Sequence, residues 1–222
     1  MGGFRYNRLG EQSRTSEIFG LMVRSYTDQQ ILKKIKGLPT FKGFPKGFYI
    51  IGIQSTEDAF NVFDDKLYLF QNTGAEFTQD INLQKFILVS SGTTNAGKNG
   101  LLKYSDYNPE GVAVVKTNEW YYDVWKYGKH KGRMEALVQV KPFLISRDGD
   151  KDQQIEEGVS RPVICGINFH ANTYDMENEV IREIIGGWSL GCQVVNNTPK
   201  YVQIMSYVKH QKIVTYCLLK EF

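Results

Sequence analysis

The sequence predicts a β-rich α+β fold that carries a small helical appendage at its N-terminal end. Short apolar and aromatic runs of strand length recur from residue 48 onward, whereas helical periodicity is confined to a few short segments. No internal repeat or low-complexity segment is visible. Many short strands with occasional helices are typical of mixed, mostly antiparallel sheets. We therefore expect a mixed β-sandwich or barrel.

The N-terminal part of the chain predicts an extended arm followed by short helices. Residues 1–15 are polar and contain glycine, which favours a loosely packed leader. Apolar spacing within residues 16–25 predicts a short helix that Gly20 weakens. The run Thr27-Asp28-Gln29-Gln30 has the pattern of a capping box, and it should start a helix over residues 28–36 that buries Ile31, Leu32 and Ile35.

A segment rich in proline and glycine, residues 37–47, leads into the main domain. We therefore divide the chain into an N-terminal arm with short helices, residues 1–45, and a main domain, residues 46–222. A helix is expected over residues 201–209. Strands are expected at residues 48–53, 66–70, 86–90, 112–115, 136–140, 143–146, 163–169, 192–195 and 213–219.

The most aromatic stretch of the chain is Trp120-Tyr121-Tyr122-Asp123-Val124-Trp125-Lys126-Tyr127. It fits a platform for sugar rings or a partner surface. Because aromatic residues are also ordinary strand formers, we favour a strand half buried in a sheet.

Composition restricts the functional class. The chain has 222 residues, of which 41% are hydrophobic, which is enough for a real core. A formal net charge of +3 argues against a dedicated nucleic-acid binder and is compatible with an anionic cell wall. No stretch has the apolar core of a signal peptide or the length of a membrane span. We expect synthesis in the cytoplasm, no membrane insertion, and action at the cell wall or in a virion after delivery by another factor.

The sequence predicts no cofactor and no metal site. Its three cysteines have unrelated spacings without a CxxC or a zinc-like cluster, so reduced thiols are expected. The run from Asp148 to Asp152 places acidic residues at alternate positions, as a calcium loop does. However, Gln153 replaces the glycine that an EF-hand requires, and Val159 occupies the twelfth position. A solvated acidic turn is the favoured interpretation.

One cysteine and one histidine fit a nucleophile pair. His170 ends a strand-like run, and Cys192 follows a glycine-rich turn, 22 positions further on. An imidazole can take the proton of a neighbouring thiol, and the thiolate attacks carbonyl carbon. The alternative is that Cys192 is a small buried apolar residue and His170 a satisfied core group.

These residues lie in motifs that carry a family resemblance. Ile167-Asn168-Phe169-His170 and Ser189-Leu190-Gly191-Cys192-Gln193 resemble the L,D-transpeptidase (YkuD-type) catalytic domain, in particular a divergent branch found in phage lysins and cell-wall peptidases. The resemblance extends over about residues 46–222. Further pieces that look like this branch are Phe63-Asp64-Asp65, Thr93-Thr94-Asn95-Ala96-Gly97, Gly111-Val112-Ala113, Gly128-Lys129-His130, Glu135-Ala136-Leu137-Val138 and Ser146-Arg147-Asp148-Gly149.

The resemblance implies an L,D-transpeptidase-like fold and a thiol enzyme that acts on peptidoglycan stem peptides. Cys192 would attack a peptide carbonyl, with His170 as general base. The backbone amide of Cys192, presented by Gly191, would be the oxyanion donor, and Ser189 would orient His170. The residues expected to contact substrate are Asn168, His130, Trp188 and Gln193. Asn168 would alternatively hold the strand edge, and His130 would alternatively be a solvated loop residue.

Two departures from the main family concern the substrate grip. Leu190 stands where the family has a second histidine, and Val194 stands where it usually has an arginine. The acyl-enzyme chemistry needs only Cys192 and His170. A structural alternative remains, because phage particles reuse enzyme folds as building blocks. In it the chain is an inactive virion component, and its partners are tail proteins rather than a peptidoglycan peptide.

Overall fold

The computed structural model describes residues 23–103 and 108–222. The arm expected at residues 1–15 lies outside the described residues, as does most of the helix expected at 16–25. Residues 23–25, the described end of that segment, are not helical.

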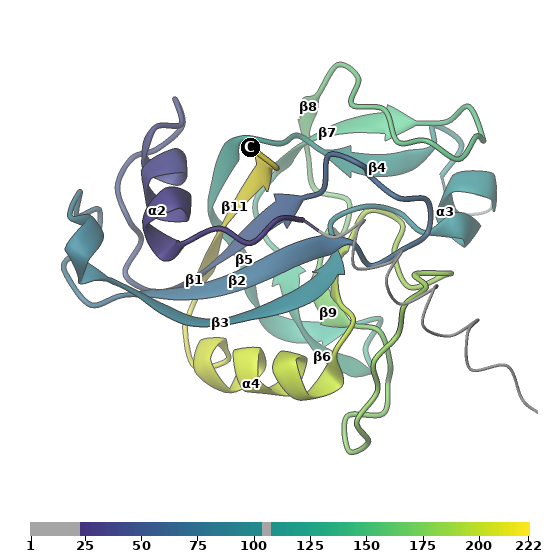
Figure 1. Cartoon of the computed structure of the whole chain (residues 1–222). Coiled ribbons are helices and arrows are strands. Elements are labelled where there is room, and N and C mark those ends of the chain that lie inside the picture. Colours follow the sequence, from purple (N-terminus) through teal and green to yellow (C-terminus); the bar gives the residue numbers. More distant parts are fainter. Residues whose placement is uncertain (1–22, 104–107) are drawn as a thin grey trace, which may run out of the picture.

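Eight strands form a closed barrel, and three more form a small sheet beside it (Figure 1). The order around the barrel is β1-β11-β5-β6-β9-β10-β3-β2, and the small sheet has the order β4-β7-β8. The barrel strands are β1 (Gly47–Gln54), β2 (Asp65–Asn72), β3 (Gln84–Thr93), β5 (Glu119–His130), β6 (Met134–Gln139), β9 (Phe169–Ala171), β10 (Gln193–Val195) and β11 (Val214–Lys220). The small sheet consists of β4 (Val112–Val115), β7 (Phe143–Asp148) and β8 (Arg161–Val163).

Most neighbouring strands pair antiparallel, and the exceptions are β1 with β11 and β9 with β10, which pair parallel. The expected β-rich α+β class is confirmed. The run expected as one strand at 163–169 is two strands, β8 and β9, which belong to different sheets. The connection between them contains Gly166 at φ 84°, a left-handed conformation that favours glycine.

Within residues 23–103 and 108–222 the helices are α2 (Asp28–Lys36), α3 (Lys98–Lys103), α4 (Thr198–Val208) and a 3-10 turn, η1 (Ile81–Leu83). The capping box at the start of α2 is confirmed, with both reciprocal Thr27–Gln30 hydrogen bonds present. The helix α4 begins earlier than expected because Asn197 accepts a hydrogen bond from the amide of Lys200 and caps it. Among the described residues, no helix combines the length and apolar character needed to cross a membrane.

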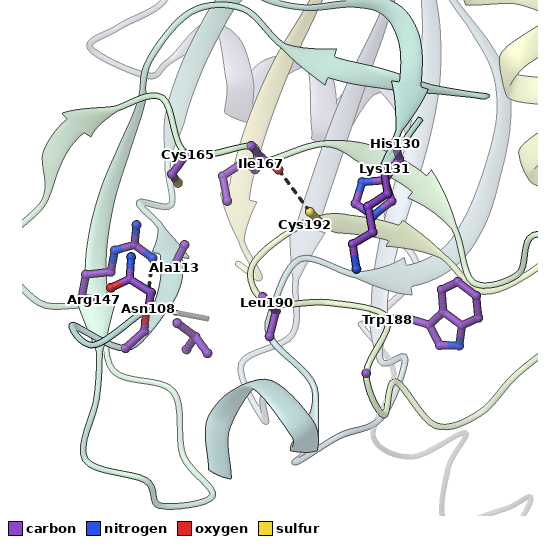
Figure 2. Close-up of a pocket in the computed structure, with 14 residues that line it drawn as sticks. Asn108, Ala113, His130, Lys131, Arg147, Cys165, Ile167, Trp188, Leu190 and Cys192 are labelled. Carbon is purple, nitrogen blue, oxygen red and sulfur yellow. Dashed lines mark hydrogen bonds between the residues drawn. The ribbon is translucent and has the colours of Figure 1, made fainter. Parts of the chain in front are cut away.

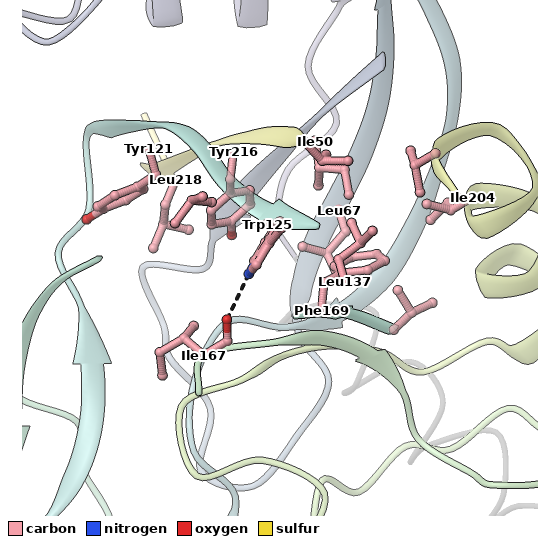
Figure 3. Packing of buried hydrophobic residues seen from close by; sticks show 14 of the residues in the cluster. Ile50, Leu67, Tyr121, Trp125, Leu137, Ile167, Phe169, Ile204, Tyr216 and Leu218 are labelled. Atoms are coloured by element: carbon pink, nitrogen blue, oxygen red, sulfur yellow. Dashed lines mark hydrogen bonds between the residues drawn. The ribbon is translucent and has the colours of Figure 1, made fainter. Parts of the chain in front are cut away.

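The barrel interior and α4 share the main core (Figure 3). Trp125 is fully buried there beside Tyr216 and Phe169. Its indole Nε1 donates a hydrogen bond to the carbonyl of Ile167, at 2.7 Å. The strand interpretation of the aromatic run is therefore confirmed, and this run holds in place the segment that leads to His170.

A second core lies between α2 and the outside of the barrel. The helix buries the three residues expected from its periodicity, Ile31, Leu32 and Ile35. The indole of Trp120 donates a hydrogen bond to the carbonyl of Ile35, at 2.9 Å. The N-terminal helix therefore packs directly on the barrel.

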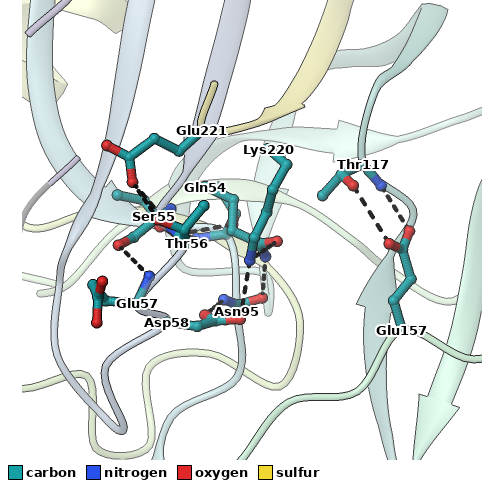
Figure 4. A network of polar contacts seen from close by, with 12 residues as sticks. Gln54, Ser55, Thr56, Glu57, Asp58, Asn95, Thr117, Glu157, Lys220 and Glu221 are labelled. Atoms are coloured by element: carbon teal, nitrogen blue, oxygen red, sulfur yellow. Dashed lines mark hydrogen bonds and ion pairs between the residues drawn. The ribbon is translucent and has the colours of Figure 1, made fainter. Parts of the chain in front are cut away.

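A polar network ties the last strand to one end of the barrel (Figure 4). The side-chain amide of Gln54 donates through Nε2 to Asn95 Oδ1 at 2.7 Å, and its Oε1 accepts from Lys220 Nζ at 3.1 Å. Lys220 also pairs with Asp58 at 3.5 Å. Because these groups lie on β1, on β11 and in the turns after β1 and β3, the network links segments that are distant in sequence.

Candidate functional site

The parallel pairing of β9 with β10 brings His170 and Cys192 together. His170 lies opposite Val194 in this ladder, and the amide of Gln193 donates to the carbonyl of Asn168 at 2.9 Å. Cys192 immediately precedes β10. A ring nitrogen of His170 and the Sγ of Cys192 lie within 4.8 Å of one another. The two residues that the sequence singled out are therefore neighbours.

The imidazole of His170 is oriented by a backbone carbonyl. Its Nδ1 donates to the carbonyl oxygen of Ala171 at 2.7 Å, and since a carbonyl only accepts, this bond puts the proton on Nδ1. Its Nε2 is buried and has no hydrogen-bond partner among the described residues. Burial, together with the neighbouring His130, lowers the pKa of His170 to about 3. The result is a neutral imidazole with an available lone pair.

The thiol of Cys192 is nearly buried, with 9% of the residue exposed. It donates to the carbonyl of Gly166 at 3.4 Å and accepts from the amide of Asn168 at 3.5 Å. Burial raises the pKa of Cys192 to about 11, although the Asn168 amide acts in the opposite direction. The resting pair is therefore a neutral thiol and a neutral imidazole rather than an ion pair.

A second imidazole packs against the first. His130, at the end of β5, stacks on His170 with ring centroids 4.1 Å apart. The side-chain amide of Asn168 donates to His130 Nδ1 at 3.0 Å, and its Oδ1 accepts from the amide of Gln139 at 3.0 Å. Burial, with Lys131 nearby, lowers the pKa of His130 to about 4. Asn168 thus fixes His130 and the edge of β6 at the same time.

A pocket of about 240 Å³ opens beside Cys192 (Figure 2). It lies between the small sheet and the turn that precedes β10. The cationic side chains at this pocket are Lys131 and Arg147. The labelled residues that form its walls include Ala113, Cys165, Ile167, Trp188 and Leu190. The pocket thus combines an apolar wall with positive charge.

Sequence reasoning did not assign Lys131 or Arg147 to the site. The guanidinium of Arg147 donates to the carbonyl of Gly111 at 3.2 Å while the side chain lines the pocket. The feature of the sequence that could have identified Arg147 is its motif, Ser146-Arg147-Asp148-Gly149, at the end of an expected strand. Arg147 therefore brings a cation to the pocket from β7, on the small sheet.

Ser189 does not play the role expected from its position. Its hydroxyl donates to the carbonyl of Cys192 at 2.9 Å and accepts from the amide of Gly191 at 3.1 Å. The expected hydrogen bond to His170 is absent from the described contacts, because Ala171 takes that place. Ser189 instead stabilises the turn over residues 189–192 that carries the thiol, the thiol-bearing turn.

Gly191 is required by close packing as well as by its conformation. Its φ of +121° is one that side chains rarely adopt. A Cβ at this position would lie 2.4 Å from the carbonyl oxygen of Ala113. The thiol-bearing turn is therefore pressed against β4, and the expected role of Gly191 in presenting the Cys192 amide stays a prediction.

The side chain of Gln193, which was expected to bind substrate, is fully buried and faces the interior rather than the pocket. Its amide nitrogen donates to the carbonyls of Thr94 and Gly191, each at 3.3 Å. Its oxygen accepts from the hydroxyl of Tyr216 at 2.6 Å. Gln193 therefore joins the thiol-bearing turn to the barrel interior.

Trp188 lies at the pocket, and its expected contact with substrate stays a prediction. Tyr174 packs against it with ring centroids 5.4 Å apart, and the guanidinium of Arg182 lies 5.8 Å from the Trp188 ring. Arg133 lies over Tyr174 in turn, at 4.4 Å. An alternation of aromatic and cationic groups therefore extends from the pocket.

The fold also assembles a donor set that the sequence did not reveal. His130, His170 and Cys192 each offer a ligand atom, and these atoms lie within 4.8 Å of one another. Two imidazoles and a thiolate suit a borderline-soft ion such as Zn²⁺. A metal bound there would occupy the ligand atoms of both Cys192 and His170.

Comparison of the chain with protein-family models, with curated proteins and with solved structures finds no match. The functional interpretation therefore depends on the geometry of Cys192, His170 and their pocket, together with the motif resemblance.

Proposed function

We propose that this chain is a cysteine-dependent peptidase or acyltransferase of the L,D-transpeptidase type, acting on peptidoglycan stem peptides. The observation that carries the proposal is the buried Nε2 of His170, which has no partner among the described residues, in an imidazole within 4.8 Å of the Cys192 thiol. A lone pair held beside a nucleophile at a pocket is the arrangement that general-base activation needs.

The proposed reaction forms and breaks one acyl bond at a time. The Sγ of Cys192 bonds to the carbonyl carbon of the substrate while the thiol proton passes to His170 Nε2. The C–N bond then breaks, and that proton leaves with the amine. Water, or a second amine, next attacks the thioester carbonyl while His170 Nε2 takes its proton. The C–S bond then breaks, the acyl group leaves, and the proton returns to the sulfur of Cys192. The carbonyl of Ala171 stabilises the transient imidazolium through Nδ1.

The resting protonation states fit a mechanism in which the proton moves only as the substrate reacts. The raised pKa of Cys192 and the lowered pKa of His170 both oppose an ion pair before substrate binds. When a substrate carbonyl carbon lies at the thiol, transfer of the thiol proton to His170 becomes favourable. The negative charge then moves from the sulfur to the carbonyl oxygen as the C–S bond forms. The candidate oxyanion donor is the backbone amide of Cys192.

The pocket favours a peptide that carries carboxylates. Lys131 and Arg147 present positive charge beside an apolar wall that includes Ile167 and Leu190. Stem peptides carry free carboxylates, and a guanidinium binds a carboxylate through paired hydrogen bonds. The fold family proposed for the barrel is the L,D-transpeptidase-like one.

One observation favours the alternative of an inactive virion protein. Cys192 and His170 are both almost fully buried, and burial is also what an inert structural thiol would show. In that case the chain would dock into a tail or similar assembly. The two proposals differ in whether Cys192 turns over substrate.

The test is digestion of purified peptidoglycan, with soluble products identified by mass spectrometry. Wild type should release stem-peptide fragments or exchange products, and Cys192→Ala should release none. Cys165→Ala is the matched control, because Cys165 is an exposed free thiol at the same pocket. Equal release by folded wild type and Cys192→Ala, or none by either, would contradict the enzymatic proposal.

A further inference from the structure

The loop between β7 and β8 gathers three carboxylates. Asp148, Asp150 and Glu156 each place one carboxylate oxygen within 4.8 Å of the others. The spacing is not that of an EF-hand, which is why the sequence pattern favoured a solvated turn. The loop folds back so that Glu156 takes a place that the linear pattern did not assign.

Asp148 is the unusual member of this cluster. It is 6% exposed, and its Oδ2 is buried without a hydrogen-bond partner among the described residues. Buried carboxylates are ordinarily paired or bound to a metal, since an unpartnered buried oxygen is costly. An unsatisfied oxygen beside two further carboxylates therefore points to a cation.

We propose that this loop binds a calcium ion through Asp148, Asp150 and Glu156. All three ligands are hard oxygen donors, which excludes a preference for soft metals. Calcium accepts irregular coordination and completes its shell with water and backbone carbonyls, whereas magnesium requires a near-ideal octahedron. A partly exposed loop with three carboxylates suits calcium. The inference does not depend on the cysteine chemistry proposed above.

The proposed ion would stiffen one wall of the pocket. Asp148 pairs with Val112 in the ladder between β7 and β4. A Cβ on Gly111 would lie 1.9 Å from the carbonyl oxygen of Asp148, so these two segments are in close contact. Arg147, the residue before Asp148, lines the pocket. Calcium at the loop would therefore hold the strand that carries Arg147.

The experiment uses the full chain freed of metal by a chelator. Calcium should raise the melting temperature of wild type by about 5–10 °C at a hundredfold excess over its Kd. Asp150→Asn and Glu156→Gln remove a ligand from exposed positions and should lose most of this shift. Glu177→Gln, an equal charge change on another exposed loop, should keep it.

Asp148→Asn separates a cation site from a carboxylate that is simply protonated. This variant should be at least as stable as metal-free wild type, because it removes a buried charge, and it should not respond to calcium. Isothermal titration gives the stoichiometry, expected to be one ion per chain. The proposal fails if wild type shows no shift at about 10 mM calcium. It also fails if Asp150→Asn and Glu156→Gln respond as wild type does, or if magnesium acts as strongly as calcium.

Discussion

The imidazole of His130 stacks on that of His170, with an interplanar angle of 24° and 4.1 Å between ring centroids. The two rings come from β5 and β9, which are not neighbours in sequence. The stack covers the proposed general base, and a charge on one ring disfavours a charge on the other. It thereby keeps His170 neutral beside the Cys192 thiol.

We expect kcat/KM to stay constant between pH 5 and 7 rather than to fall as the pH is lowered. In the proposed mechanism the neutral form of His170 is the base, and a pKa lowered to about 3 keeps that form populated throughout this range. The measurement is kcat/KM against stem peptides from pH 4 to 9. A tenfold loss of kcat/KM per pH unit below about 6.5, the ordinary histidine pKa, would show that burial does not keep the imidazole of His170 neutral.

Replacing His130 should shift this profile. His130→Ala exposes His170 to water, so its pKa should rise towards the ordinary value and an acidic decline should enter the measured range. His130→Phe keeps a flat ring over His170 and should retain the wild-type profile. If His130→Ala changes only KM and leaves the pH profile unaltered, His130 contacts substrate rather than positioning the base.

Alkylation of Cys192 should be slow at neutral pH and accelerate with alkali. Since its pKa is raised to about 11, the thiolate fraction grows about tenfold per unit up to roughly pH 10. Iodoacetamide labelling in a Cys165→Ala background measures the rate, because the remaining cysteine, Cys217, is fully buried. A rate that is flat from pH 5 to 8 would reveal a thiolate–imidazolium pair instead.

Gln193→Ala should destabilise the protein by about 1–3 kcal/mol. The substitution leaves the hydroxyl of Tyr216 and the carbonyl of Thr94 without their buried partner. Urea unfolding measures the change, and Gln203→Ala on the exposed face of α4 is the control. An equal, small effect from both variants would mean that Gln193 is not a structural link.

Two adjacent buried aspartates predict a pH dependence of stability. Burial, with the charge of Asp65 beside it, raises the pKa of Asp64 well above its ordinary value of 3.8. Between the ordinary and the raised pKa the folded state binds more protons than the unfolded chain, so stability falls as pH rises through that window. Asp64→Asn should flatten the dependence and stabilise the protein at pH 8 by roughly 1–3 kcal/mol. The free energy of unfolding at pH 5 and 8 measures both effects, and a wild type more stable at pH 8 would contradict them.

Local features of this fold could be predicted from the sequence, and features that depend on tertiary register could not. The helix α2 and its capping box follow from residues three to four positions apart, so the pattern contains the whole signal. The approach of Cys192 to His170 could be predicted because each ends or precedes a strand-like run. The prediction of a single strand at 163–169 was wrong, because the apolar character of a run does not show that the chain passes from one sheet to another.

The orientation of side chains at the site could not be predicted, because it also depends on tertiary register. Ser189 and Gln193 flank the thiol in sequence, yet one bonds its own turn and the other faces the barrel interior. The stack of His130 on His170 and the position of Arg147 depend on which strands close the barrel and which form the small sheet. No spacing in the sequence specifies that closure.

The most direct test of the central claim is to trap the acyl-enzyme. A stem peptide mixed with the protein and quenched in acid should give a thioester adduct, and peptide mapping should place it on Cys192. His170→Ala should form the adduct at least about a hundredfold more slowly, because it lacks the general base. An adduct on Cys165, or cleavage that persists unchanged in Cys192→Ala, would contradict the account.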